Sequence, residues 1–207
     1  MEIINHRINS LKQLSELREE DGAEIDIRYH ENELILHHDP FAHHLNENLS
    51  LDIFLENWVY KGILILNLKT EGIEEECLRL INKHNVKRWF FLDMSMPFFV
   101  KYSELAFKSD LEGLSFSNLA VRFSEKEPLE YALSFNNKAE WIWVDCFKTL
   151  VLNNKSYEKI KALNFKICLV SPELQNHPLE KIDEFKVLLK GMEIDAVCTK
   201  YPDRWEK

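Results

Sequence analysis

The chain has 207 residues, 45% of them apolar and 29% charged, a length and composition that predict one folded domain over 1–207. Its formal net charge of −9 argues against a general nucleic-acid-binding protein, because phosphate backbones are bound by basic surfaces. The N-terminus shows no basic segment before a long apolar run, and no apolar run reaches the roughly 18–20 residues of a membrane span, so we expect a cytoplasmic protein with no signal peptide and no stable membrane insertion.

Short apolar runs alternate along the chain with longer amphipathic runs, and no linker or low-complexity tract interrupts them. The short runs predict eight β-strands, over 2–6, 23–30, 62–69, 88–95, 119–123, 140–146, 165–171 and 194–199. The amphipathic runs predict seven helices, over 10–20, 51–58, 73–83, 97–107, 128–135, 156–163 and 179–189. A further apolar segment, 33–36, follows a turn at 31–32 and predicts a hairpin that returns His38 over the carboxylates of the second strand.

Several predicted strands are apolar on both faces, for example 63–66 and 89–92, as expected when both sides of a parallel sheet are buried. Eight such strands alternating with helices predict a compact (β/α)8 TIM barrel. The competing architecture is an open doubly wound sheet. A Gly-rich dinucleotide-binding turn after the first strand would favour that sheet, and the sequence has no such turn.

The four cysteines stand singly in the sequence, and three of them fall in predicted strands. Because no C-x-x-C pair is present, the spacing favours buried free thiols in a reducing cytosol over a metal or redox site. The cysteines are Cys77, Cys146, Cys168 and Cys198.

Polar side chains gather at the carboxyl ends of the predicted strands, where barrel enzymes place their active sites. Glu24 and Asp26 lie two residues apart on one strand, so they face the same way and repel each other when buried. Such a pair usually needs a cation, and the hard ions Mg²⁺ and Ca²⁺ prefer oxygen ligands. Ion pairs with Arg7, Arg28 or Lys69 are the alternative partners for the two carboxylates.

Histidines and further polar groups accompany this pair along the predicted rim. His6 follows the first strand and His38 follows the hairpin, which makes both candidates for acid–base catalysis. Lys69 shares a face with Asn67 and can either meet a phosphate oxygen or bridge to a carboxylate. Further candidates for the pocket are Arg28, Asp93, Arg122, Trp143 and Asp145. The remaining histidines are expected to be structural: His30, His37, His43, His44, His84 and His177.

These motifs resemble those of the PLC-like phosphodiesterases and, within them, the glycerophosphodiester phosphodiesterase family. His6-Arg7 matches the opening His-Arg of that family, Glu24-Ile25-Asp26 its Glu-x-Asp, and His38-Asp39 its His-Asp. Asn67-Leu68-Lys69 stands where the family has Glu-x-Lys. The segment 195–202, which reads DAVCTKYP, is similar to its final Asp-small-x-x-Thr-Asp-x-Pro.

The resemblance implies a TIM barrel and assigns seven residues: the acid–base pair His6 and His38, the phosphate ligands Arg7 and Lys69, and the metal ligands Glu24, Asp26 and Asn67. Asn67 offers an amide oxygen in place of the third acidic ligand of the family. The Gly that follows His-Arg in the family is Ile8 here. The segment between the second and third strands is short, which leaves little room for a capping subdomain.

The sequence therefore predicts a metal-assisted phosphodiesterase, using Mg²⁺ or Ca²⁺, that hydrolyses a small glycerophosphodiester-like substrate. Two alternatives stay open: a phospholipase-C- or sphingomyelinase-D-like lyase that releases a cyclic phosphodiester, and a barrel that binds a phospho-ligand without turnover. The sequence leaves open the alcohol groups of the substrate, which histidine is the acid, and the oligomeric state.

Overall fold

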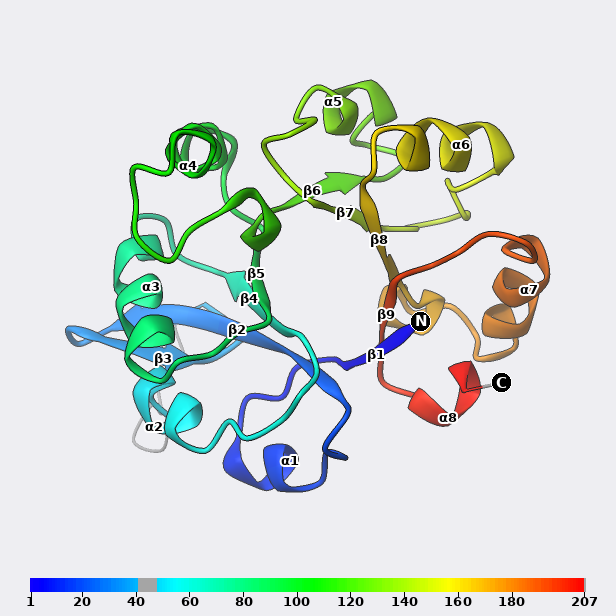
Figure 1. The fold of residues 1–207 in the computed structure, drawn as a ribbon. Coiled ribbons are helices and arrows are strands. Elements are labelled where there is room, and N and C mark those ends of the chain that lie inside the picture. The colour runs from blue at the N-terminus through cyan, green and yellow to red at the C-terminus, as the bar shows by residue number, and fades with distance from the viewer. Residues whose placement is uncertain (41–47, 207) are drawn as a thin grey trace.

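A barrel of eight parallel strands forms the centre of the molecule in the computed structural model, which describes residues 1–40 and 48–206 (Figure 1). Its strands are β1 (Glu2–Asn5), β2 (Gly22–His30), β4 (Leu64–Leu68), β5 (Trp89–Leu92), β6 (Ala120–Phe123), β7 (Trp141–Val144), β8 (Lys166–Val170) and β9 (Ala196–Thr199). They pair in the order β5-β4-β2-β1-β9-β8-β7-β6. The antiparallel β3 (Glu33–Leu36) pairs with the end of β2 and forms the predicted hairpin.

Helices follow the barrel strands and form a ring around them (Figure 1). They are α1 (Leu11–Ser15), α2 (Leu51–Glu56), α3 (Glu74–Lys83), α4 (Met96–Lys108), α5 (Leu129–Leu133), α6 (Asn154–Ala162), α7 (Glu180–Leu188) and α8 (Pro202–Trp205), with the 3-10 helices η1 (Phe116–Asn118) and η2 (Pro172–Gln175). The predicted (β/α)8 barrel is confirmed, and each of the eight predicted strands overlaps an observed one.

Two helices differ from the prediction. The helix expected over 10–20 ends at Ser15, because Arg18 binds the Asp21 carboxylate at 2.7 Å and the Lys61 N–H donates to the Glu19 carbonyl at 2.9 Å. These contacts hold 16–21 as a turn against the approach to β4. The short helix α8 was not predicted; Pro202 opens it, and the indole N–H of Trp205 donates to Ser171 at 2.8 Å.

Each barrel strand buries one face inside the barrel and the other face under the helices. The interior cluster consists of strand residues such as Ile4, Ile65 and Cys168. The rings of Phe90 and Trp141 stack there with centroids 5.0 Å apart, near the amino ends of β5 and β7. This burial on both faces is the reason that the strands are apolar on both parities.

The junction between β5 and β6 has sparse backbone pairing compared with the other strand pairs. In the described part of the chain, an isolated bridge between Phe91 and Leu119 joins the two sides. At the amino end of β5, the buried side-chain amide of Asn118 donates to the carbonyl of Trp89 at 3.1 Å. The barrel is therefore nearly closed, with a seam between β5 and β6.

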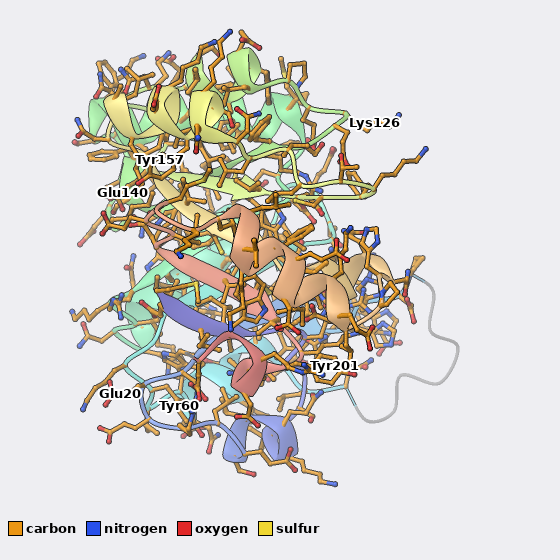
Figure 2. All side chains as sticks on the ribbon, turned by 90° about the vertical axis from the view of Figure 1, so that its right-hand side faces the viewer. Glu20, Tyr60, Lys126, Glu140, Tyr157 and Tyr201 are labelled. Carbon is orange, nitrogen blue, oxygen red and sulfur yellow. The ribbon has the colours of Figure 1, made fainter. Side chains whose placement is uncertain are left out.

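The two ends of the barrel can be followed in a side view (Figure 2). Lys126 and Tyr201, which follow the carboxyl ends of β6 and β9, lie toward one side. Glu20 and Glu140, which precede β2 and β7, lie toward the other. The polar rim predicted from the sequence belongs to the end that carries Lys126 and Tyr201.

The four cysteines are buried free thiols, as the sequence predicted. Burial raises the pKa of the Cys146 thiol to about 12 and shifts the pKa values of Cys77, Cys168 and Cys198 in the same direction. Separately, no helix within residues 1–40 and 48–206 combines the length and apolar character needed to cross a bilayer.

Candidate active site

An open cavity of about 220 Å³ lies at the carboxyl ends of the barrel strands. Its walls come from nearly every strand end, which explains why residues far apart in the sequence meet there. The lining residues are His6, Arg7, Glu24, Asn67, Lys69, Leu92, Asp93, Arg122, Trp143, Asp145, Phe147, Val170, Leu174 and Gln175.

The turn after β1 places His6 and Arg7 beside the carboxylates of β2. The His6 N–H continues the β1–β9 ladder by donating to the Thr199 carbonyl at 3.0 Å. Arg7 then takes a left-handed conformation, with φ 59°, and its N–H donates to Glu24 Oε2 at 2.8 Å. The positive φ falls on Arg7 and not on Ile8, so the glycine that the family has at position 8 is not required by this backbone.

Glu24 and Asp26 are 1% exposed, and amide groups of the chain bind both carboxylates. Glu24 Oε1 accepts a bond of 2.8 Å from the side-chain amide of Asn67. Asn9 binds Asp26 twice: its Nδ2 donates to Asp26 Oδ2 and its Oδ1 accepts from the Asp26 N–H, both at 2.9 Å. Burial and the neighbouring Asp26 raise the pKa of Glu24 to about 7.

Two cations approach Asp26, so the ion-pair alternative is partly realised. Lys69 Nζ lies 3.5 Å from Asp26 Oδ1 and 3.3 Å from Asp93 Oδ2. Arg7 Nε lies 4.0 Å from Asp26 Oδ2. Arg28 does not line the cavity. Its guanidinium donates to the backbone carbonyls of His38 and Lys69, at 2.8 and 3.1 Å, and so ties the hairpin to the end of β4.

The ring of His38 is held on both sides. Its Nδ1 lies 2.7 Å from Asp39 Oδ1, and its Nε2 lies 2.5 Å from Arg7 Nη2. A guanidinium only donates, so Nε2 accepts and Nδ1 carries the proton toward Asp39. The predicted hairpin is present, but it brings His38 to Arg7, which lines the cavity, whereas the sequence predicted a position over the carboxylates of β2.

His6 lies on the other side of Arg7, with its Nε2 3.8 Å from Glu24 Oε2. Its side chain is 14% exposed, and its buried Nδ1 has no hydrogen-bond partner in the described part of the chain. Burial lowers the pKa of His6 to about 3, and the charges of Arg7 and Lys200 act in the same direction. His6 is thus held as a neutral imidazole.

The opposite wall is a network centred on Arg122. Its guanidinium binds Asp93 Oδ1 at 2.5 Å, Asp145 Oδ2 at 2.7 Å and Glu127 at 3.0 Å. Burial lowers the pKa of Arg122, but these three carboxylates outweigh that effect and raise it. Asp93, Arg122 and Asp145 line the cavity together with Trp143, so four of the five further pocket candidates lie on it.

The histidines expected to be structural mostly make local contacts. His84 binds Asp52 at 2.6 Å, His177 binds the Phe147 carbonyl at 3.1 Å, and His37 binds the Asp39 carbonyl at 2.8 Å. His30 lies 3.6 Å from Glu31. His43 and His44 lie outside the described residues.

The predicted metal ligands lie together but contain only two acidic side chains. Within residues 1–40 and 48–206, no group of three or more His, Cys, Asp or Glu side chains is arranged for a metal ion. However, Asp26 and Asn67 occupy paired positions on β2 and β4, and their Oδ1 atoms are buried without a hydrogen-bond partner there. A hard divalent cation satisfies such oxygens, so Glu24, Asp26 and Asn67 fit a loosely held Mg²⁺ or Ca²⁺. Lys69 competes with that cation for Asp26.

No protein-family model matches the chain, and no curated protein matches it in sequence. Among solved structures, it is similar to the crystal structure of a glycerophosphodiester phosphodiesterase from Agrobacterium tumefaciens str. C58, with a TM-score of 0.70. The match covers 99% of this chain and 98% of that one. The chain has the fold of that phosphodiesterase. The two sequences are 12% identical, so the similarity establishes the fold alone. The function of the site is therefore argued from the residues of this chain.

Besides the apolar lining residues Leu92, Val170 and Leu174, three residues that shape the site were not predicted. Asn9 clamps Asp26, and its position three residues after His6 was the one available signal. Gln175 donates to Asp145 Oδ1 at 2.8 Å. Phe147 lines the cavity because the Glu125 carboxylate accepts the N–H groups of Phe147, Lys148 and Thr149, at 3.1, 2.8 and 2.8 Å. Nothing in the sequence marks Glu125 as the anchor of that loop.

Proposed function

We propose that the chain is a phosphodiesterase that hydrolyses a small phosphodiester of the glycerophosphodiester type. One observation carries the proposal: two histidines and two cations surround a buried carboxylate pair at the open end of a barrel. The shared fold with a glycerophosphodiester phosphodiesterase supports it at the level of reaction class. The two histidines are His6 and His38, and the two cations are Arg7 and Lys69.

In this proposal Arg7 and Lys69 bind the non-bridging oxygens of the phosphoryl group. Both are already oriented, Arg7 by His38 and Lys69 by Asp26 and Asp93. Their positive charges stabilise the negative charge that grows on phosphorus-bound oxygens during the reaction. When Arg7 turns from His38 to the phosphoryl group, it also releases the lone pair of His38 Nε2.

The two imidazoles then move the protons. Neutral His6 can accept a proton from the attacking water. Burial and the neighbouring cations hold the pKa of this ring low, and the negative charge of a bound phosphodiester raises it and so makes the ring a stronger base. His38, whose Nδ1 proton is held by Asp39, can take up a second proton at Nε2 and donate it to the leaving alkoxide. Asp39 orients the ring through Nδ1, so the proposed roles of base and acid follow from the different contacts of the two rings.

A divalent cation held by Glu24, Asp26 and Asn67 would add Lewis-acid stabilisation of the phosphoryl oxygens when bound. Glu24 and Asp26 serve the site in another way too. Glu24 accepts the Arg7 N–H and Asp26 faces Lys69, so the carboxylates fix the two phosphate-binding cations. We further propose a small-molecule substrate, no nucleic-acid partner and a cytoplasmic location.

The experiment that tests the proposal is a panel of glycerophosphodiesters and bis(p-nitrophenyl) phosphate, assayed with Mg²⁺, Mn²⁺ or Ca²⁺ and with a chelator. Hydrolysis that needs His38 is expected. Phosphorus NMR of the products separates hydrolysis from the lyase alternative, since the lyase releases a cyclic phosphodiester. Absence of turnover with every substrate and metal would overturn the proposed activity.

A binding barrel without turnover is the second candidate, and two observations favour it. Asn67 replaces a carboxylate at the metal site, and Nε2 of His38 is engaged by Arg7. A phospho-ligand that stays bound and intact in excess divalent cation is the result expected of such a protein. The neutral, buried His6 beside Glu24 favours the enzyme, because a binding site alone does not need that ring.

A further inference from the structure

Lys200 is a cation beside the candidate site whose charge the described part of the chain leaves unmatched. The other cations of the rim have partners: Arg7 contacts His38 and Asp26, and Lys69 contacts Asp26 and Asp93. Within residues 1–40 and 48–206, Lys200 Nζ makes no hydrogen bond or ion pair. A free ammonium group at the same end of the barrel as these two oriented cations can supply an additional contact to an anion.

The strand register places Lys200 next to His6. Asn5 pairs with Thr199 across β1 and β9, so the following residues, His6 and Lys200, are neighbours on the two strands. Ala196 and Cys198 belong to the cluster inside the barrel, and alternation along the strand puts Lys200 on that same face. Lys200 therefore continues the inner face of β9 at the open end of the barrel, where it is exposed and lies just outside the residues that line the cavity.

The backbone at Lys200 is firmly held, which fixes the base of its side chain. The Lys200 N–H donates to Glu173 Oε1 at 3.0 Å, and the Thr199 hydroxyl donates to the same oxygen at 2.6 Å. On the other side, the Tyr201 N–H donates to Thr199 Oγ1 at 2.9 Å. Glu173 Oε2 accepts the hydroxyl of Ser171, so this nearby carboxylate is already bound by three donors.

We propose that Lys200 is a phosphate-binding residue, a third cation for the phosphoryl group on the β9 side of His6, in addition to Arg7 and Lys69. The proposal rests on the proposed function and makes it more specific. The class of ligand is a phosphate monoester or diester anion. In the segment 195–202 the lysine stands where the family pattern has an acid, so the site gains a cation at that position and loses an anion at Asn67.

The test is the affinity for inorganic phosphate, which shares the anion chemistry of the substrate and lacks its alcohol groups. Calorimetric or phosphorus NMR titrations would compare the wild type with Lys200→Ala, Lys200→Arg and the matched control Lys126→Ala. Lys126 is an exposed lysine at the same end of the barrel, after β6 (Figure 2). Titrations in chelator keep any metal contribution out of the comparison, and melting curves check that each variant folds.

We expect Lys200→Ala to weaken phosphate binding by roughly 3- to 10-fold, as for the loss of one charge-assisted contact at a partly open site. Lys200→Arg should retain binding within about twofold, because the cation is kept. The loss should shrink at high salt, which screens an exposed ammonium group. In a turnover assay, Lys200→Ala should raise KM more than it lowers kcat.

Three results would overturn the proposal: a wild type that does not bind phosphate, a Lys200→Ala variant that binds it as the wild type does, and equal losses for Lys200→Ala and Lys126→Ala. Equal losses in the two variants would mean that phosphate binding depends on the overall electrostatic potential of the protein and not on a contact with Lys200. Failure of the proposed function is a different result. A protein that binds phosphate through Lys200 but cleaves no phosphodiester keeps the Lys200 assignment and removes the enzymatic activity.

Discussion

Asn67→Asp is the sharpest probe of the carboxylate pair, because it replaces one buried amide by a third carboxyl group of the same shape. In the wild type, Asn67 Nδ2 donates to Glu24 Oε1 at 2.8 Å. A hydrogen bond to a charged acceptor contributes roughly 1.5–3 kcal/mol, and the variant replaces it by two facing carboxyls. Unit charges 4 Å apart repel by about 4 kcal/mol at an effective dielectric constant near 20, so the two groups will share a proton. Burial and the neighbouring Asp26 already raise the pKa of Glu24, so this carboxyl takes up a proton more easily than an ordinary one.

Without metal, we therefore expect Asn67→Asp to lose about 2–3 kcal/mol of unfolding free energy, which lowers Tm by about 4–12 °C in a chain of this length. A third carboxylate also strengthens binding of a divalent cation. At a hundredfold excess over its Kd, a ligand stabilises the folded state by about 2.7 kcal/mol. Mg²⁺ should thus restore most of the lost stability in the variant and raise the Tm of the wild type less.

The assay is thermal unfolding in chelator and in excess Mg²⁺, with Asn118→Asp as the matched control. Asn118 is also a buried amide, but it donates to the Trp89 carbonyl at the β5–β6 seam, away from Glu24 and Asp26. The reasoning is refuted if Asn67→Asp melts like the wild type in chelator. It is equally refuted if Mg²⁺ raises the Tm of both aspartate variants by the same amount.

Three further predictions concern catalysis, pH and the opposite wall. His38→Ala should lower kcat by roughly 10²–10⁴, as for loss of a general acid or base, with phosphodiester turnover as the measurement. In the unfolded chain, His6 takes up a proton as the pH falls through its ordinary pKa near 6.5, whereas in the folded chain its pKa is about 3. Protonation between these values therefore favours the unfolded chain, so the unfolding free energy of the wild type decreases as the pH falls from 6.5 toward 3. Measured by urea unfolding, the unfolding free energy of the wild type should fall by about 3 kcal/mol more than that of His6→Asn between about pH 7 and 4.5. Arg122→Ala should destabilise the fold by about 3–5 kcal/mol, because Asp93 and Asp145 lose their partner.

Each of these has a control. His37→Ala changes the neighbouring ring and should keep turnover; equal losses in the two histidine variants would remove His38 from the chemistry. A wild type and His6→Asn with parallel pH profiles would show that His6 titrates normally in the folded state. If Arg122→Ala unfolds at the same urea concentration as the wild type, the network on that wall contributes nothing measurable.

The sequence could predict the positions of those site residues that depend on the alternation of side chains along a strand or on a local turn. Glu24 and Asp26 share a face because they are two apart on one strand, and the turn at 31–32 returns His38 to the rim. Arg28 shows where alternation stops working. It has the parity of Asp26, but β2 pairs with β4 only as far as Ile27 and then continues alongside β3, so Arg28 binds backbone carbonyls outside the cavity.

Other parts of the site depend on contacts that a single sequence does not display. The clamp of Asn9 on Asp26 joins two residues that strand periodicity does not relate. Phe147 reaches the cavity because Glu125, on the preceding loop, binds three consecutive N–H groups. Both are hydrogen bonds between loops, and loops have no period that a pattern can reveal.

The seam between β5 and β6 has a consequence for ligand binding. Along β5, the seam is joined by the Asn118 amide and the Phe91–Leu119 bridge. Just past the carboxyl end of β5, it is joined by the ion pair of Asp93 with Arg122, which belongs to the cavity wall. At this junction the barrel is thus held together partly by the charges that face a bound ligand. A ligand anion that draws Arg122 away from Asp93 would loosen the barrel there, while one that leaves the pair intact would not. Amide exchange in β5 and β6 thereby becomes a reporter of how deeply a ligand enters the cavity.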